Sequence, residues 1–194
     1  MHLILCLRNI SGISDWINKK ECIIMLSNKI TQLIHEQINK ELYSAYLYLD
    51  FANYYSVAGL AGFYNWFLVQ AQEERDHAML FTKYLLNNSI APKYMAIKAP
   101  TGKYADFNAP LLGSLEHERF ITASIYDIYA EASATHDFKT TQFLDWFVKE
   151  QGEEEMNSED NIRKYELFGQ DSKGLYMLDA ELGARIYAPP TLII

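Results

Sequence analysis

The stretch VQAQEERDHAMLF, residues 69–81, places charged side chains inside a run that otherwise favours an apolar helix. At about 100° of rotation per residue, a helix through this run directs Glu74 and His77 to its apolar face. The residues that share this face are Phe63, Phe67, Glu74, His77, Phe81 and Leu85. Because an unpaired buried charge is costly, the carboxylate and the imidazole need a partner that accepts both. A metal ion is such a partner.

The same pattern recurs in three further segments with helical periodicity. The predicted helices cover about 26–57, 60–88, 111–138 and 139–168, and the quoted stretch belongs to the second. Each of the other three also places a carboxylate on its apolar face. These residues are Glu41 in the first helix, Glu118 in the third, and Glu150 and Glu154 in the fourth, with Gln151 at the margin. Every predicted helix therefore directs a carboxylate towards the core.

The connections between the segments indicate the topology. Two connections are short, whereas NNSIAPKYMAIKAPTGKYADFNAP at 87–110 contains three prolines and can run the length of a bundle. Residues 1–91 and 111–188 contain no proline, which allows long uninterrupted helices. The expected fold is an all-α four-helix bundle with one long crossover. GLYMLDAEL at 174–182 predicts a short fifth helix, and the tail that follows shows no periodicity.

Composition and charge argue against several classes of protein. The 194 residues are 49% hydrophobic and 22% charged, which suits one well-buried domain. A net charge of −8 without a Lys/Arg-rich run argues against nucleic acid as a partner and favours cations. The opening MHLILCLRNI is a poor secretory signal, and no other apolar run approaches the roughly 20 residues that span a bilayer. Two cysteines, Cys6 and Cys22, imply no disulfide framework and fit a reducing cytoplasm.

A buried hydrogen-bond network and an interhelical salt-bridge core are the alternatives to a metal centre. One polar residue on an apolar face is usually a satisfied core group, but here the coincidence would have to occur on four helices. No Lys or Arg falls on these faces to neutralise the carboxylates, so a metal is the simplest counter-charge. Carboxylates with a single imidazole suit iron or manganese, whereas zinc usually recruits more His or Cys.

Several acids around one position also favour a dinuclear site, because a shared carboxylate can hold two cations a few ångströms apart. We assign this bridging role to Glu74. Tyr48 follows Glu41 by two turns on the same face. Its hydroxyl can hydrogen-bond a site carboxylate or donate an electron, and simple packing is the alternative.

An accessory cation site is predicted beside this centre. Glu73 projects about 100° away from Glu74, towards the flank on which Glu150 and Glu153 also lie. Three acids that converge without a histidine should bind a cation weakly and through oxygen.

Over residues 25–183 the chain resembles the bacterial non-haem ferritins. The motifs that carry the resemblance, in order along the chain, are EQINKELYSAYLY, AQEERDH, EHE, EQGEEE and GLYMLDAEL. The resemblance implies a cytoplasmic iron-storage protein with ferroxidase activity, built as a shell of twenty-four identical subunits. At a di-iron centre within each subunit, dioxygen or hydrogen peroxide would oxidise Fe(II), and ferric mineral would form inside the shell.

The resemblance also assigns the ligands, residue by residue. The ligands of the first iron would be Glu41, Glu74 and His77. The ligands of the second would be Glu74, Glu118 and Glu154, with Gln151 beside them. A third iron site, typical of the bacterial branch, would be formed by Glu73, Glu150, Glu153 and Glu154.

Two departures from related families bear on function. A bacterioferritin would carry a second ExxH in the fourth helix and a methionine that ligates haem. Gln151 and Glu154 occupy the matching pair here and no methionine lies near the end of the first helix, so we expect no haem. A di-iron oxygenase or peroxidase of the rubrerythrin kind is the rival function, but the chain contains no CxxC module. A structural shell-former with a vestigial centre is disfavoured because every expected ligand is present.

Residues 1–24 have no counterpart in the family pattern, which begins at MLSNKITQLI with Met25. They are either an extension outside the fold or a misassigned start, and residues 184–194 form a tail. Helix signals begin only after Met25, with Ser27 as the candidate N-cap.

We therefore predict that a chain beginning at Met25 forms the same large assembly as the full chain, because the first 24 residues do not pack into the bundle. Size-exclusion chromatography with light scattering measures the outcome. A truncated chain that fails to assemble would show that the extension is structural.

Overall fold

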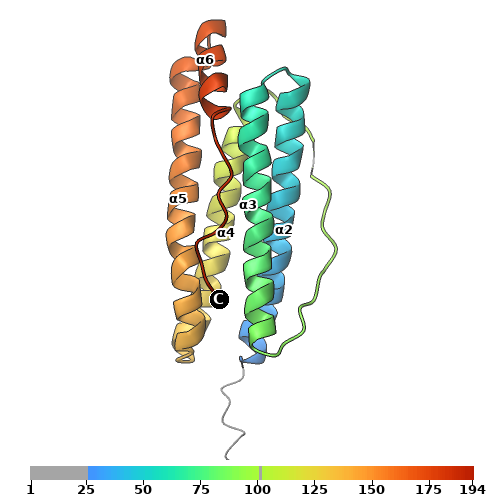
Figure 1. The fold of residues 1–194 in the computed structure, drawn as a ribbon, viewed down its shortest axis with the longest axis vertical. Helices are drawn as coiled ribbons and strands as arrows, with labels where there is room; N and C mark the ends of the chain where they lie inside the picture. Colours follow the sequence, from blue (N-terminus) through green and yellow to red (C-terminus); the bar gives the residue numbers. More distant parts are fainter. Residues whose placement is uncertain (1–25, 101) are drawn as a thin grey trace, which may run out of the picture.

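The computed structural model describes residues 26–100 and 102–194 (Figure 1). Its helices are α2 (Asn28–Val57), α3 (Ala61–Asn87), α4 (Ala109–Ala134), α5 (Phe138–Phe168) and α6 (Ser172–Leu182). The first four pack into a bundle and α6 caps one end, which confirms the predicted all-α fold with a short fifth helix. The predicted extension at 1–24 lies outside the described residues. No helix in the described part is both long enough and apolar enough to cross a membrane.

Local sequence signals set the helix ends. Ser27 caps α2 as predicted, since its side chain accepts a hydrogen bond from the Ile30 backbone N–H at 3.1 Å. The third helix ends at Ala134 and does not reach the predicted boundary at 138. His136 adopts a left-handed φ of 56°, which breaks the helix, and Asp137 then caps α5 by accepting from the Thr140 N–H at 3.1 Å.

A long crossover connects α3 to α4 along the outside of α2 (Figure 1). Two tyrosines of α2 and the crossover fix its final part. The Tyr55 hydroxyl donates to the Phe107 carbonyl at 2.6 Å, and the Tyr104 hydroxyl donates to the Asp50 carboxylate. The crossover returns the chain to the end of the bundle where α3 begins, so α4 runs parallel to α3.

The apolar core of the bundle consists of two clusters. One includes Ile34, Phe81 and Phe147, and the other includes Tyr55, Phe67 and Leu182. Along each bundle helix, the buried residues between the two clusters are polar. A polar layer therefore crosses the middle of the bundle and separates two apolar halves.

Helix α6 and the tail that follows it contact the bundle at α3. The Asp179 carboxylate accepts from the N–H groups of Gly62 and Phe63 at 2.8 and 3.0 Å, and α3 has no side-chain cap of its own. Asp179 thus supplies an N-terminal cap for a helix more than a hundred residues earlier in the chain. After α6, residues 183–194 run back along the bundle between α3 and α5 (Figure 1).

We predict that Gly62→Ala lowers the melting temperature, because the new Cβ would lie 1.6 Å from the Asp179 carbonyl oxygen. Overpacking of this kind costs about 1–3 kcal/mol, and a shift of α6 would also weaken the Asp179 cap. Gly152→Ala is the matched control: no atom lies within 4 Å of its Cβ, so the melting temperature should hold or rise. Circular dichroism melts of both variants measure the difference. Equal stabilities would contradict the role of the Gly62 contact.

Candidate metal centre

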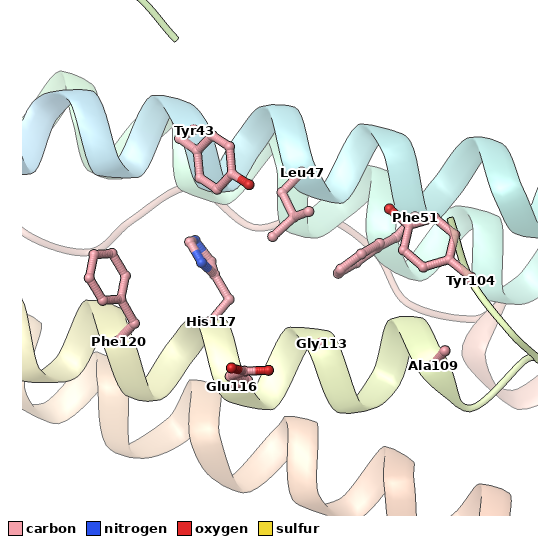
Figure 2. A pocket seen from close by; sticks show the side chains of 9 residues that line it. All are labelled: Tyr43, Leu47, Phe51, Tyr104, Ala109, Gly113, Glu116, His117 and Phe120. Atoms are coloured by element: carbon pink, nitrogen blue, oxygen red, sulfur yellow. The ribbon is translucent and has the colours of Figure 1, made fainter. Parts of the chain in front are cut away.

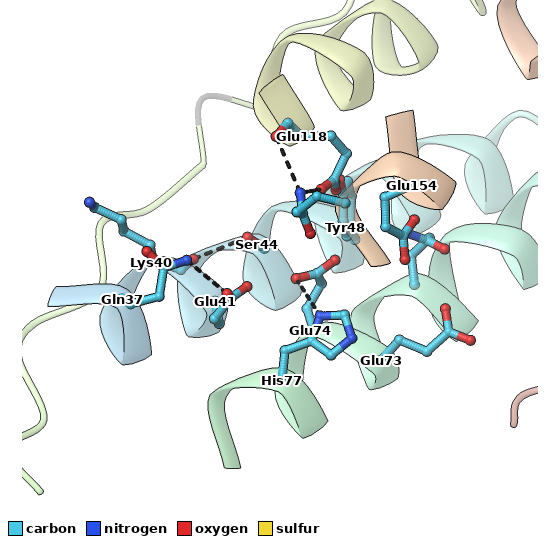
Figure 3. Close-up of polar contacts among 12 residues, drawn as sticks. Gln37, Lys40, Glu41, Ser44, Tyr48, Glu73, Glu74, His77, Glu118 and Glu154 are labelled. Atoms are coloured by element: carbon cyan, nitrogen blue, oxygen red, sulfur yellow. Dashed lines mark hydrogen bonds and ion pairs between the residues drawn. The ribbon is translucent and has the colours of Figure 1, made fainter. Parts of the chain in front are cut away.

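The polar layer of the bundle contains the five predicted ligands of the dinuclear site (Figure 3). They are Glu41 from α2, Glu74 and His77 from α3, Glu118 from α4 and Glu154 from α5, and all five side chains are buried. Glu41, Glu74 and His77 each offer one ligand atom, and these three atoms lie within 4.8 Å of one another. The structure therefore brings residues from two neighbouring helices to one cation position.

Glu118 and Glu154 lie outside this group of three and are oriented by hydrogen bonds. Tyr48 donates its hydroxyl to Glu118 Oε1, and Gln151 Nε2 donates to Glu118 Oε2 at 3.0 Å. Gln70 Nε2 donates to Glu154 Oε2 at 2.9 Å. Neutral donors thus fix both carboxylates at the side of the centre away from His77 (Figure 3).

A hydrogen-bond chain from the surface fixes Glu41. Lys40 Nζ donates to Ser124 Oγ at 2.5 Å, and Ser124 Oγ donates to Gln37 Oε1 at the same distance. With its oxygen occupied in this way, Gln37 directs its Nε2 to Glu41 Oε1 at 2.8 Å. One oxygen of Glu41 is therefore held by an amide and the other is left for a ligand.

The sequence analysis did not identify Gln37 or Gln70. Both precede a core glutamate by four residues, which places each amide on the same helix face as a predicted ligand. This four-residue spacing is the feature of the sequence that could have identified the two glutamines.

Two carboxylate oxygens of the centre are buried without any hydrogen-bond partner. They are Oε2 of Glu41 and Oε1 of Glu74. The other oxygen of Glu74 lies 3.6 Å from His77 Nδ1. Because buried polar atoms are almost always satisfied, two orphaned acceptors on adjacent ligands indicate a place for a cation. The donor set of carboxylates with one imidazole fits iron or manganese.

Burial raises the pKa values of three acids in the centre, Glu41, Glu74 and Glu118. The pKa of Glu41 rises because the side chain is desolvated, and that of Glu74 rises further because Glu118, Glu41 and Glu154 add repulsion. Burial, with repulsion from Glu154, raises the pKa of Glu118 to about 8. Among the described residues, no Lys or Arg forms an ion pair with these acids. The carboxyl groups of the centre therefore have no cationic side chain beside them that would neutralise their negative charges.

Burial and the Glu118 charge also hold the pKa of Tyr48 well above its usual value. The phenol therefore remains protonated and can donate its hydrogen bond to Glu118 throughout the physiological range.

The acids predicted for the accessory site face a separate cavity of about 330 Å³. Its walls include Glu73, Glu150 and Glu153, together with His77, Trp146, Lys149 and tail residues 188–191. Burial raises the pKa of Glu73 to about 7 although the Arg185 guanidinium opposes the shift, and burial also raises the pKa of Glu150. Glu154 is not among the residues of this wall. The sequence analysis did not foresee the cation Arg185, which pairs with Glu73 at 2.5 Å.

A second hollow, of about 390 Å³, lies between α2 and α4 on the side of the crossover (Figure 2). Its walls are mainly aromatic, and none of the predicted ligands lines it. The His117 ring lies with Nε2 2.8 Å from Ser44 Oγ, and burial lowers the pKa of His117 to about 4. The imidazole is therefore neutral at pH 7 and serves the packing between the two helices.

Known proteins resemble this chain over most of the bundle. The model of the Ferritin family, described as a ferritin-like domain, matches residues 31–168. A bacterial non-heme ferritin of Staphylococcus aureus is 32% identical over 163 residues, which cover 84% of this chain and 98% of that protein. A probable bacterial non-heme ferritin-like protein of Haemophilus influenzae is 32% identical over 159 residues, 82% of this chain and 96% of that protein.

A solved ferritin structure is also similar to this chain. The open pore ferritin of Archaeoglobus fulgidus superimposes with a TM-score of 0.82 at 38% identity, over 84% of this chain and 99% of that one. Together with the family match over most of the bundle, this similarity identifies the chain as a member of the ferritin family, with bacterial non-haem ferritins among its relatives.

Proposed function

We propose that this protein stores iron and oxidises Fe(II) at the buried carboxylate centre. The observation that carries the proposal is the convergence of acids from four helices on one buried layer, with two carboxylate oxygens that lack a partner and no Lys or Arg paired with these acids in the part of the chain that the structure describes. Such a layer is costly unless a cation enters it. The ferritin relatives make iron the cation of choice.

Each ligand has a separate task in this proposal. The first Fe(II) is held by Glu41, Glu74 and His77, and the second is held by Glu74, Glu118 and Glu154. We assign the bridge between the two positions to Glu74, whose Oε1 is buried without a hydrogen-bond partner while its other oxygen lies 3.6 Å from His77 Nδ1. Gln151 and Tyr48 do not bind iron in this scheme and instead orient Glu118.

The donor set favours oxidation. Hard carboxylate oxygens stabilise Fe(III) over Fe(II), and a centre with one nitrogen ligand can release its ferric product. Two Fe(II) ions supply two electrons, which together with two protons reduce dioxygen to hydrogen peroxide. The same two electrons reduce hydrogen peroxide to water when peroxide is the oxidant. We propose dioxygen or hydrogen peroxide as the co-substrate and no haem.

The carboxyl groups also balance charge as iron enters. Acids whose pKa values are raised carry protons in the metal-free protein and lose them when a cation binds. Each positive charge that enters the centre is thus partly offset by a proton that leaves.

For storage, the ferric product must be enclosed. We propose that the subunits assemble into a cytoplasmic shell of twenty-four copies, as the ferritin resemblance implies, and that ferric mineral forms inside it. Light scattering of the purified protein tests the assembly directly.

Removal of a ligand of the first iron position should slow the oxidation of Fe(II) and leave the assembly of the subunits intact. We predict that Glu74→Ala and His77→Ala each reduce the initial rate of aerobic Fe(II) oxidation about tenfold or more, as followed by ultraviolet absorbance. Glu166→Ala, at an exposed position of α5, is the control and should match the wild type. Wild-type rates in both ligand variants would refute the assignment of the centre.

The acids of the centre also predict how stability depends on pH. The pKa of Glu118 is raised from its ordinary 4.5 to about 8, so the folded state holds a proton that the unfolded state has released. This contribution to stability is complete below about pH 4.5 and is lost as the pH rises through about 8. We expect the melting temperature of the metal-free protein to fall more steeply between pH 6 and about 8.5 than that of Glu118→Gln.

The second measurement for this prediction is the change in melting temperature that a divalent cation causes. Because the cation replaces protons, it should raise the wild-type melting temperature more at about pH 8 than at pH 6. A pH slope that is unchanged in Glu118→Gln would show that this carboxyl group does not titrate in the folded protein.

A further inference from the structure

The tail after α6 closes the cavity that contains the accessory acids. Residues 188–191 form one wall, and the opposite walls are Glu73 of α3 and Glu150 and Glu153 of α5. The side chains of α3 and α5 pack on each other elsewhere, with the centres of the Phe81 and Phe147 rings 4.2 Å apart, and the tail runs over the groove that this cavity forms between the two helices.

Polar contacts attach the tail along this groove. Asn65 Nδ2 donates to the Arg185 carbonyl at 2.9 Å, and the Tyr187 hydroxyl donates to Asp76 Oδ2 at 2.5 Å. Farther along, Trp146 Nε1 donates to Thr191 Oγ1 at 3.2 Å. The Trp146 ring in turn packs edge-on against the ring of His77 at 5.6 Å, so the tail extends to the neighbourhood of the metal centre.

The strongest of these contacts is made by Arg185. Its Nη2 lies 2.5 Å from Glu73 Oε2, and its guanidinium lies 4.1 Å from the centre of the Trp66 ring. Only 16% of the Arg185 side chain and 17% of the Glu73 side chain are exposed. A charge-assisted hydrogen bond shielded from water in this way is considerably stronger than an ion pair on the open surface.

We infer that Arg185 is the cation that neutralises Glu73 and determines whether a metal ion binds at this carboxylate, whereas Lys149 pairs with Glu153 at 4.0 Å on the other side of the cavity. A divalent cation on the Glu73 carboxylate would face the guanidinium at close range, and two positive charges at that separation repel strongly outside bulk water. A metal ion can therefore bind Glu73 only when the Arg185 guanidinium leaves this carboxylate.

This inference deepens the proposed function and rests on it in one respect. If the centre oxidises iron, ferric ions that leave past His77 enter a cavity closed by the tail. Arg185 then limits the number of cations that each subunit binds outside its dinuclear centre.

Binding of a cation without redox chemistry tests the inference apart from any oxidation. Terbium(III) is a hard, oxygen-seeking probe, and its luminescence gives the number of ions bound per subunit of the full-length protein. We predict that Arg185→Gln binds one more terbium ion per subunit than the wild type. Anomalous diffraction from terbium-soaked crystals should place this ion at Glu73, with Glu150 or Glu153 as a further ligand.

The matched control is Arg119→Gln. Arg119 also pairs with glutamates, at 2.8 Å to Glu159 and 3.8 Å to Glu155, but on the exposed surface. Its removal should leave the number of bound ions unchanged. The double variant Arg185→Gln with Glu73→Gln should lose the additional ion, which ties the gain to this carboxylate.

Two results would overturn the inference. One is an equal number of terbium ions in the wild type and in Arg185→Gln. The other is a wild-type crystal with terbium on Glu73 while Arg185 keeps its ion pair. Because terbium is not oxidised, a wild type that fails to oxidise Fe(II) would refute the proposed function and leave this test in force.

Discussion

The cost of burying several carboxyl groups together is the constraint on which the rest of the structure depends. Glu41, Glu74, Glu118 and Glu154 lie in one layer of the bundle, and desolvation makes each negative charge costly. Apolar clusters on both sides keep the four helices together across this layer. Hydrophobic burial in the two halves therefore offsets the cost of the buried acids in the middle, and a cation that enters and replaces their protons relieves that cost.

The protein orients these acids with neutral groups and not with its own cations. Gln37, Gln70, Gln151 and Tyr48 all donate hydrogen bonds to site carboxylates. A neutral donor fixes the direction of an oxygen without cancelling its charge, whereas a Lys or Arg would do both and compete with the metal. On the flank the arrangement is the opposite, because the Arg185 guanidinium pairs directly with the Glu73 carboxylate and neutralises its charge.

Helical periodicity was sufficient to predict the bundle and the core-facing Glu41, Glu74, Glu118 and Glu154, and residue preference predicted the Ser27 cap, because each depends on residues close in sequence. Glu150, predicted on the core face of the fourth helix, is only partly buried and lines the flank cavity instead. Gln37 and Gln70 each stand four residues before a core glutamate but became meaningful only once their contacts with Ser124 and Glu154 on other helices were known, whereas Gln151 was already predicted beside the second iron position. The tail was beyond prediction for a further reason. Its position depends on contacts such as Arg185 with Glu73, between residues more than a hundred positions apart, and no local pattern specifies such a pairing.

The two sets of acids are linked through the rotation of α3. Glu73 and Glu74 are adjacent, so about 100° of helix rotation directs one to the flank and the other to the core. A small rotation of α3 about its axis would misplace both. Helix α6 opposes such a rotation, since Asp179 caps α3 at Gly62 and Phe63 and the backbone of α6 approaches Gly62 too closely for a side chain to fit between them. The tail that follows α6 pairs with Glu73 about three turns farther along the same helix. The segment that fixes the orientation of α3 therefore also carries the cation that neutralises Glu73.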